Sequence, residues 1–175
     1  MRRLSLLIWI VFLSCYRTNT ETASLSLVNN QGYYKEFHRL VQESSQSIYL
    51  CMFVAKLREG TLVEYIYQDL ADAASRGIDV RVILDSSYYD SSLNAENTAF
   101  AESLRKVGIR VCFDTPFPTT HAKFGIFDHS TVLIGSTNWT ESSLERNNEV
   151  NIVVQNRDIA EDLEDYFFKL WREND

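Results

Sequence analysis

The sequence alternates apolar segments rich in β-branched and aromatic residues with segments whose apolar residues recur at helical spacing. Residues 47–54 (SIYLCMFV) form a nearly continuous apolar run, which is typical of a strand buried on both faces. Thr61 and Glu64 follow as a capping box, which indicates the start of a helix. Strands separated by helices can pair in parallel, so we predict an α/β fold with a mixed, largely parallel β-sheet flanked by helices.

The same patterns predict the order of elements along the chain. Helices are expected at 33–43, 61–76, 95–107 and 158–175, and strands at 47–54, 79–84, 109–113, 123–127, 131–134 and 149–154. A chain of 175 residues suits one domain. We place that domain at 31–175, after a polar linker at 16–30.

The first 15 residues have the features of a targeting segment. Arg2 and Arg3 precede the apolar run 4–13, which predicts a secretory signal peptide and therefore an exported, periplasmic or secreted protein. The alternative is an uncleaved membrane anchor, although the run is shorter than the roughly 20 apolar residues of a membrane-spanning helix. Cys15 follows Ser14 in an imperfect lipoprotein box, so lipidation at Cys15 is a second route to membrane attachment.

The formal net charge of −7 argues against a polyanion partner, because affinity for a phosphate backbone comes from Lys and Arg. Residues 158–175 hold seven acidic and two basic residues, so most of this charge is the solvated face of one predicted helix. Residues 105–127 carry a local net charge of +3. The overall charge therefore weakens a nucleic-acid assignment without removing it.

Two cysteines, Cys51 and Cys112, lie in the predicted domain, each within an apolar strand. Two buried thiols are favoured over one disulfide, and the sequence leaves the distance between them open.

The segment 120–139 (THAKFGIFDHSTVLIGSTNW) concentrates the side chains that carry chemistry. Alternation along a strand places His121 and Lys123 on one face, and a hairpin returns the chain so that Ser136 and Asn138 approach them. Imidazole is a nucleophile or general acid–base near neutral pH, and a lysine neutralises phosphoryl oxygens. We expect Glu149 to orient the imidazole. Together these groups suit a phosphodiester.

The pattern H-x-K-x4-D-x6-G-S-x-N, from His121 to Asn138, resembles the motif of the phospholipase D superfamily at each of its six fixed positions. The resemblance extends over about residues 31–171 and is strongest to the short bacterial endonucleases that carry a single motif. It implies a phospholipase D-like fold, no cofactor and no metal. It also implies that His121, Lys123, Ser136, Asn138 and Glu149 are catalytic, with Lys123 and Asn138 binding the phosphoryl oxygens. Asp128 belongs to the motif, but its place at the hairpin turn indicates a structural role.

A single motif is half of what this superfamily uses. The resemblance implies a homodimer with the active site at the two-fold interface, where His121 of one subunit forms a phosphohistidine and the partner's His121 acts as acid and then base. The expected substrate is DNA or RNA, cleaved by an exported endonuclease. The alternative is a phospholipase D or cardiolipin-type hydrolase acting on phospholipid. Tyr88 and Tyr89 follow a strand and could stack bases, contact lipid, or simply pack as a loop.

Overall fold

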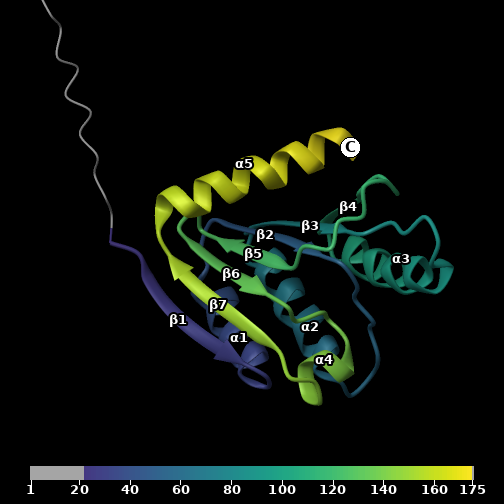
Figure 1. Ribbon diagram of the computed structural model, residues 1–175, viewed down its shortest axis with the longest axis horizontal. Coiled ribbons are helices and arrows are strands. Elements are labelled where there is room, and N and C mark those ends of the chain that lie inside the picture. The colour runs from purple at the N-terminus through teal and green to yellow at the C-terminus, as the bar shows by residue number, and fades with distance from the viewer. Residues whose placement is uncertain (1–21, 175) are drawn as a thin grey trace, which may run out of the picture.

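The computed structural model describes residues 22–174 as one seven-stranded mixed sheet with helices on both faces (Figure 1). The strand order is β1-β7-β6-β5-β2-β3-β4. The strands are β1 (Ser24–Asn29), β2 (Ser47–Met52), β3 (Asp79–Leu84), β4 (Arg110–Phe113), β5 (Phe124–Phe127), β6 (Thr131–Gly135) and β7 (Val150–Gln155). The helices are α1 (Gly32–Glu43), α2 (Leu62–Ser75), α3 (Ser91–Lys106), α4 (Glu141–Glu145) and α5 (Arg157–Asn174).

The helices divide unequally between the two faces of the sheet. The larger core cluster packs α1, α2, α3 and α4 against one face, and Phe37, Phe100 and Trp139 are fully buried within it. The smaller cluster packs α5 against the other face through Ala160, Phe167 and the partly covered Leu163. Four helices therefore cover one face of the sheet, and the single amphipathic helix α5 covers the other. None of the helices within residues 22–174 is both long and apolar enough to span a bilayer.

The prediction of an α/β fold with a mixed sheet is confirmed, but the sheet is not largely parallel. Only β2 with β3 and β3 with β4 pair in parallel, through the crossover helices α2 and α3. The other four strand pairs are antiparallel. For β5 and β6 the reason is connection length, because a tight turn joins them and permits only antiparallel pairing. The predicted hairpin at 123–134 already implied this antiparallel pair.

The predicted linker at 16–30 is wrong over its second half. Ser24–Asn29 form β1, which pairs antiparallel with β7 at the edge of the sheet. The alternating sequence SLSLVN is a strand pattern that the polar residues preceding it obscured. The folded domain therefore begins near Ser24 and not at residue 31. The predicted signal peptide or anchor, Cys15 and the start of the linker lie outside the described residues.

Helix boundaries differ from the predictions where caps decide them. Helix α3 begins four residues earlier than expected, because the Asp90 carboxylate accepts hydrogen bonds from the backbone N–H groups of Ser92 and Leu93, both at 3.0 Å. The short helix α4 was not predicted. The Asn156 side chain caps α5 by accepting from the N–H of Ile159 at 2.9 Å.

Cys51 and Cys112 are buried thiols that form no disulfide with each other. Cys51 is in register with Ile83 on β3, and Ile83 with Cys112 on β4. The two cysteines are thus two strands apart, about 10 Å, which is beyond the reach of a disulfide. Burial raises the pKa of the Cys51 thiol well above its usual range.

Gly135 ends β6 at a point where no side chain fits. An added Cβ would lie 2.3 Å from Oδ1 of Asn151 and 2.4 Å from the carbonyl oxygen of Val150. This close approach brings the backbone of β6 against β7. The Oδ1 atom of Asn151 then accepts from the N–H of Thr137, and the side-chain amide of Asn151 donates to the hydroxyl of Thr137. The glycine of the motif is therefore required by strand packing.

We expect Gly135→Ala to lower the free energy of unfolding by about 1–3 kcal/mol, because β6 and β7 must separate to admit the methyl group. Urea denaturation measures this loss. Gly32→Ala is the matched control, because a Cβ there meets Val28 at an ordinary 3.6 Å, and it should change stability by less than about 1 kcal/mol. Equal stability of the two variants would contradict the packing explanation.

Candidate active site

Three strand ends meet at one edge of the sheet and carry the residues predicted to be catalytic. Lys123 directly precedes β5, Ser136 directly follows β6, and Glu149 directly precedes β7. The N–H of Gly135 donates to the carbonyl of Lys123 at 3.2 Å, and the N–H of Ser136 donates to that of Val150 at 3.1 Å. Because neighbouring strands run antiparallel, these positions coincide in space although they are up to 26 residues apart in sequence.

His121 and Lys123 form the centre of the site. Nζ of Lys123 lies 3.0 Å from Nε2 and 3.1 Å from Nδ1 of His121, and it donates to the carbonyl oxygen of His121 at 2.9 Å. The ring of Phe53 packs edge-on against the imidazole with centroids 4.4 Å apart, and Nζ lies 5.1 Å above the same phenyl ring. His121 is exposed whereas Lys123 is buried. An accessible ring is thus backed by an enclosed cation.

The electrostatics favour a neutral imidazole. Desolvation lowers the pKa of His121, and the adjacent Lys123 ammonium lowers it further. Desolvation also lowers the pKa of Lys123, while the carboxylate of Glu149 opposes that shift. A neutral imidazole has one ring nitrogen with a free lone pair, and this is the form of the ring that can attack phosphorus.

Ser136 and Glu149 form a hydrogen-bonded pair beside this centre. The hydroxyl of Ser136 donates to Oε2 of Glu149 and accepts from the N–H of Val150 at 3.1 Å. The amide of Asn147 donates to Oε1 of Glu149 at 3.3 Å. These contacts differ from the expected one, because Glu149 holds Ser136 and influences Lys123, and no hydrogen bond joins it to His121 within the described chain.

Asn138 is half-buried on the loop that follows Ser136, and its Oδ1 is buried without a hydrogen-bond partner among the described residues. The loop is fixed by the next residue, Trp139, which the sequence analysis did not select. Trp139 is fully buried, its Nε1–H donates to the hydroxyl of Tyr33 at 3.0 Å, and its N–H donates to the carbonyl of Val54 at 3.1 Å. The sequence signal for this role of Trp139 was its position directly after Asn138, the last residue of the motif.

A buried carboxyl pair, Asp85 and Asp114, contacts the residue before the histidine and was not predicted. The N–H of Thr120 donates to Oδ1 of Asp85 at 2.9 Å and to Oδ2 of Asp114 at 3.1 Å. The N–H of Ser86 donates to the other oxygen of Asp114 at 2.7 Å. Burial, reinforced by the charge of Asp114, raises the pKa of Asp85 to about 6. A signal was present, because each aspartate directly follows a parallel strand and such ends meet at one edge.

Asp128 lies at the opposite end of the β5–β6 hairpin from His121. Its carboxylate accepts hydrogen bonds from the N–H groups of Ser45, Gln46 and Ser47 at 2.8–3.1 Å. These bonds lower the pKa of Asp128 although desolvation opposes them. These contacts join the β5–β6 turn to the start of β2, so the role of Asp128 in this chain is structural.

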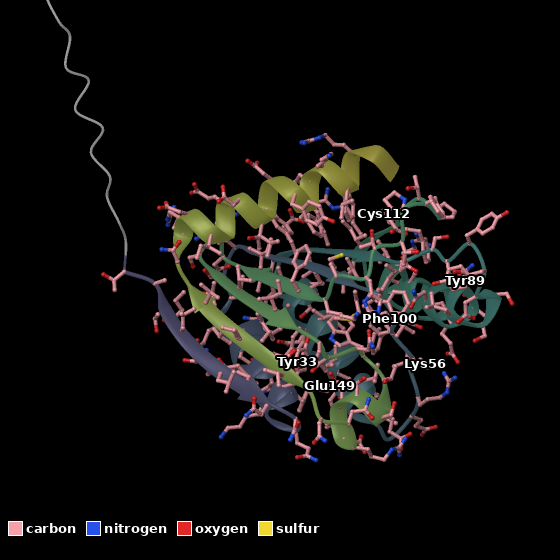
Figure 2. The ribbon with its side chains drawn as sticks, in the orientation of Figure 1. Tyr33, Lys56, Tyr89, Phe100, Cys112 and Glu149 are labelled. Atoms are coloured by element: carbon pink, nitrogen blue, oxygen red, sulfur yellow. The ribbon has the colours of Figure 1, made fainter. Side chains whose placement is uncertain are left out.

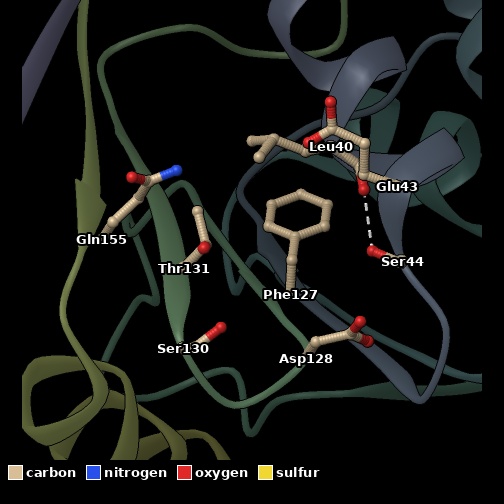
Figure 3. Close-up of a pocket in the computed structure, with 8 residues that line it drawn as sticks. All are labelled: Leu40, Glu43, Ser44, Phe127, Asp128, Ser130, Thr131 and Gln155. Atoms are coloured by element: carbon tan, nitrogen blue, oxygen red, sulfur yellow. Dashed lines mark hydrogen bonds between the residues drawn. The ribbon is translucent and has the colours of Figure 1, made fainter.

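A small cavity of about 180 Å³ adjoins Asp128 and Phe127 (Figure 3). Its lining also includes Leu40 and Ser44 of the α1 end and Gln155 at the end of β7. It therefore lies at the far edge of the sheet from His121 and takes no part in the candidate site.

Tyr88 and Tyr89 lie in the loop after β3 and are both exposed, at 79% and 78%. Figure 2 shows Tyr89 at the periphery of the molecule, beside α3, apart from Glu149. The two tyrosines thus lie at the same edge of the sheet as His121 and Lys123, but they are not part of the hydrogen-bonded group of site residues.

The site thus combines an exposed imidazole beside an enclosed lysine side chain with a hydroxyl and an amide on the adjoining loop, a set of groups that suits chemistry on a phosphoryl group. Within residues 22–174 no group of three or more His, Cys, Asp or Glu side chains is arranged to hold a metal ion.

Comparison with known proteins agrees with this interpretation. Residues 37–171 match the family model described as "Cardiolipin synthase, PLD-like domain". The chain belongs to this family, and with it to the phospholipase D superfamily, as the motif predicted.

Two curated relatives are a mitochondrial cardiolipin hydrolase of Mus musculus, 28% identical over 86% of this chain, and a phospholipase D of Rickettsia prowazekii, 31% identical over 78%. The chain spans about 62–63% of the length of these two relatives. Among solved structures, Nuc from Salmonella typhimurium has a TM-score of 0.75 at 22% identity, with 88% of this chain and 97% of Nuc covered. NucT from Helicobacter pylori has a TM-score of 0.69 at 19% identity, with 87% and 98% covered. These structures share the fold.

We expect Asp85→Asn to stabilise the fold progressively as the pH rises from about 4 to about 6. Asp85 has a raised pKa, so the folded state binds its proton more tightly than the unfolded state. Ionisation of Asp85 across that range therefore lowers the free energy of unfolding of the wild type. The Asp85→Asn variant does not ionise there and keeps its stability. Urea denaturation at several pH values measures the difference between the two proteins.

Asp90→Asn is the control, because the helix N–H groups lower the pKa of Asp90 and its titration falls below this range. The Asp90→Asn difference should therefore stay level between pH 4 and 6. A level difference for Asp85→Asn as well would contradict the raised pKa of Asp85.

Proposed function

We propose that this chain is a metal-independent phosphodiesterase that works through a phosphohistidine on His121. The observation that carries the proposal is the exposed His121 ring with the buried Lys123 Nζ 3.0 Å from its Nε2. In the proposed reaction a ring nitrogen attacks phosphorus, the bond from phosphorus to the leaving oxygen breaks, and water then cleaves the phosphorus–nitrogen bond. Lys123 neutralises the phosphoryl oxygens, and Asn138 donates to them.

The leaving oxygen needs a proton, and the single chain has no second imidazole at the site. His38 bonds Asp69 at 2.8 Å, between α1 and α2. His129 bonds Glu164 at 2.7 Å, at the far end of the β5–β6 hairpin. We infer that a second copy supplies the acid, so that the partner's His121 protonates the leaving group and afterwards activates water.

The surface next to the site supports such a dimer. The antiparallel register puts five side chains on the α5 face of β1, β7 and β6, and each is 39–67% exposed. They are Leu25, Leu27, Ile134, Val150 and Ile152. Helix α5 packs over the middle of the sheet and leaves this apolar face open. Because Ile134 and Val150 adjoin the strand ends that carry Ser136 and Glu149, a symmetric contact here would bring two sites together.

Phospholipid is the substrate class that we propose. The curated relatives are named as a cardiolipin hydrolase and a phospholipase D. Lys123 lies beside His121, but the two arginines of the same basic segment point elsewhere. Arg110 pairs with Asp79 at the opposite edge of the sheet, and Arg105 donates to the carbonyl of Val111 at 2.8 Å. Endonuclease activity remains the second candidate, on the resemblance of the single motif to short endonucleases.

We expect His121→Ala to lower hydrolysis of bis(4-nitrophenyl) phosphate by at least about 10³-fold, because it removes the nucleophile. The assay is run in EDTA, and mass spectrometry of acid-quenched wild type should find the phosphorylated peptide that contains His121. His38→Ala is the matched control and should keep the wild-type rate. Activity that requires added metal, or that survives His121→Ala, would contradict the mechanism. Phospholipid vesicles and plasmid DNA, assayed in parallel, separate the two substrate classes.

We expect Leu27→Asp to convert the dimer into monomers in sedimentation velocity and to lower the rate together with the dimer fraction, because it places a carboxylate in the apolar face. Tyr65→Asp is the control, since Tyr65 is 44% exposed on α2, away from that face. A fully active Leu27→Asp monomer would refute the shared site.

A further inference from the structure

Three aromatic side chains are more exposed than any other large hydrophobic residue in the described part of the chain. Tyr88, Tyr89 and Phe117 are 79%, 78% and 81% exposed. The tyrosines lie in the loop between β3 and α3, and Phe117 lies in the loop between β4 and β5. Exposure of one such ring is ordinary, but three such rings on two loops at one edge of the sheet point to a contact with a partner.

The two loops are joined to each other and to the site. The Asp114 carboxylate accepts from the N–H of Ser86, at the base of the first loop, and from the N–H of Thr120, at the end of the second. Thr120 directly precedes His121. The three rings therefore lie at the edge of the sheet where His121 opens to solvent.

Hydrogen bonds brace the base of the tyrosine loop. The side chain of Asn94 accepts from the N–H of Ser87 at 2.7 Å and donates to its carbonyl at 2.8 Å. The hydroxyl of Ser87 accepts from the N–H of Asp90 at 3.1 Å. This bracing uses the polar groups of the loop base and leaves the two rings projecting, so little conformational freedom is lost when they contact a partner.

The two loops carry no cation of their own, which fits an uncharged interface better than a polyanion. Residues 82–104 and 111–122, which include both loops, contain no lysine or arginine. Surfaces that stack bases combine aromatic rings with a positively charged groove for the backbone, and such cations are missing from both loops. Tyrosine and phenylalanine without cations suit the boundary between the headgroups and acyl chains of a bilayer.

We propose that Tyr88, Tyr89 and Phe117 form a membrane-contacting rim, which inserts between phospholipid headgroups and holds the phosphodiester of a lipid at the level of His121. This proposal rests on the proposed phosphodiesterase activity. It adds that the activity takes place at the surface of a bilayer. Because the rings carry no charge, the contact with a bilayer is apolar, and its strength should depend little on salt.

The test compares two substrates on the full chain. The variant combines Tyr88→Ser, Tyr89→Ser and Phe117→Ser, and Tyr65→Ser is the control because Tyr65 is an exposed tyrosine on α2. We expect the triple variant to lose at least about 10-fold of its rate on phosphatidylcholine vesicles, with and without cardiolipin. Its rate on soluble bis(4-nitrophenyl) phosphate should stay within about 2-fold of wild type. The wild-type rate on vesicles should hold between about 50 and 500 mM salt, where a polyanion contact would weaken steeply.

The other outcomes are distinguishable. A wild type inactive on the soluble ester would overturn the proposed function itself. A wild type active on the soluble ester but not on vesicles, or a triple variant with unchanged vesicle activity, would overturn the rim alone. Equal loss on both substrates would assign the rings to the catalytic centre or to folding. Loss of plasmid cleavage with vesicle hydrolysis intact would assign them to nucleic-acid stacking.

Discussion

The antiparallel pairing of β5 with β2 is the contact on which the rest of the structure depends. It joins the parallel unit β2–β3–β4 to the antiparallel strands β5, β6, β7 and β1. Because β5 runs against β2, the start of β5 lies at the edge where the parallel strands end. The histidine and lysine before β5 thus meet the aspartates that follow β3 and β4. The same reversal places the end of β6 and the start of β7 at that edge.

Burial of Lys123 is the energetic cost of this arrangement. An ammonium removed from water is unfavourable unless opposite charges or hydrogen bonds compensate it. Here the His121 carbonyl accepts from Nζ, and the nearby Glu149 and Asp85 favour the charged form. These interactions oppose the desolvation that lowers the pKa of Lys123, and none of them is a strong ion pair. This leaves its field directed at the imidazole and at the space where we propose a phosphoryl group binds.

The unequal coverage of the sheet connects the fold with the proposed assembly. Helix α5 covers the middle of one face and carries six acidic and three basic residues on its length. The strands β1, β7 and the end of β6 keep an apolar face open beside Ser136 and Glu149. A chain with one nucleophile and one uncovered face is consistent with two copies that complete each other, as we propose.

The sequence by itself determined the local content of this protein. Periodicity predicted most helices and strands, and six motif residues at fixed spacing predicted the superfamily and the group around His121, because neighbours along a hairpin are set by local geometry. Only the tertiary structure decided which strands pair, and therefore that most pairs are antiparallel and that Ser24–Asn29 is a strand. It alone placed Asp85 and Asp114 behind Thr120, and Glu149 against Ser136 rather than His121. These contacts join distant segments, and no local pattern records which strand ends will meet.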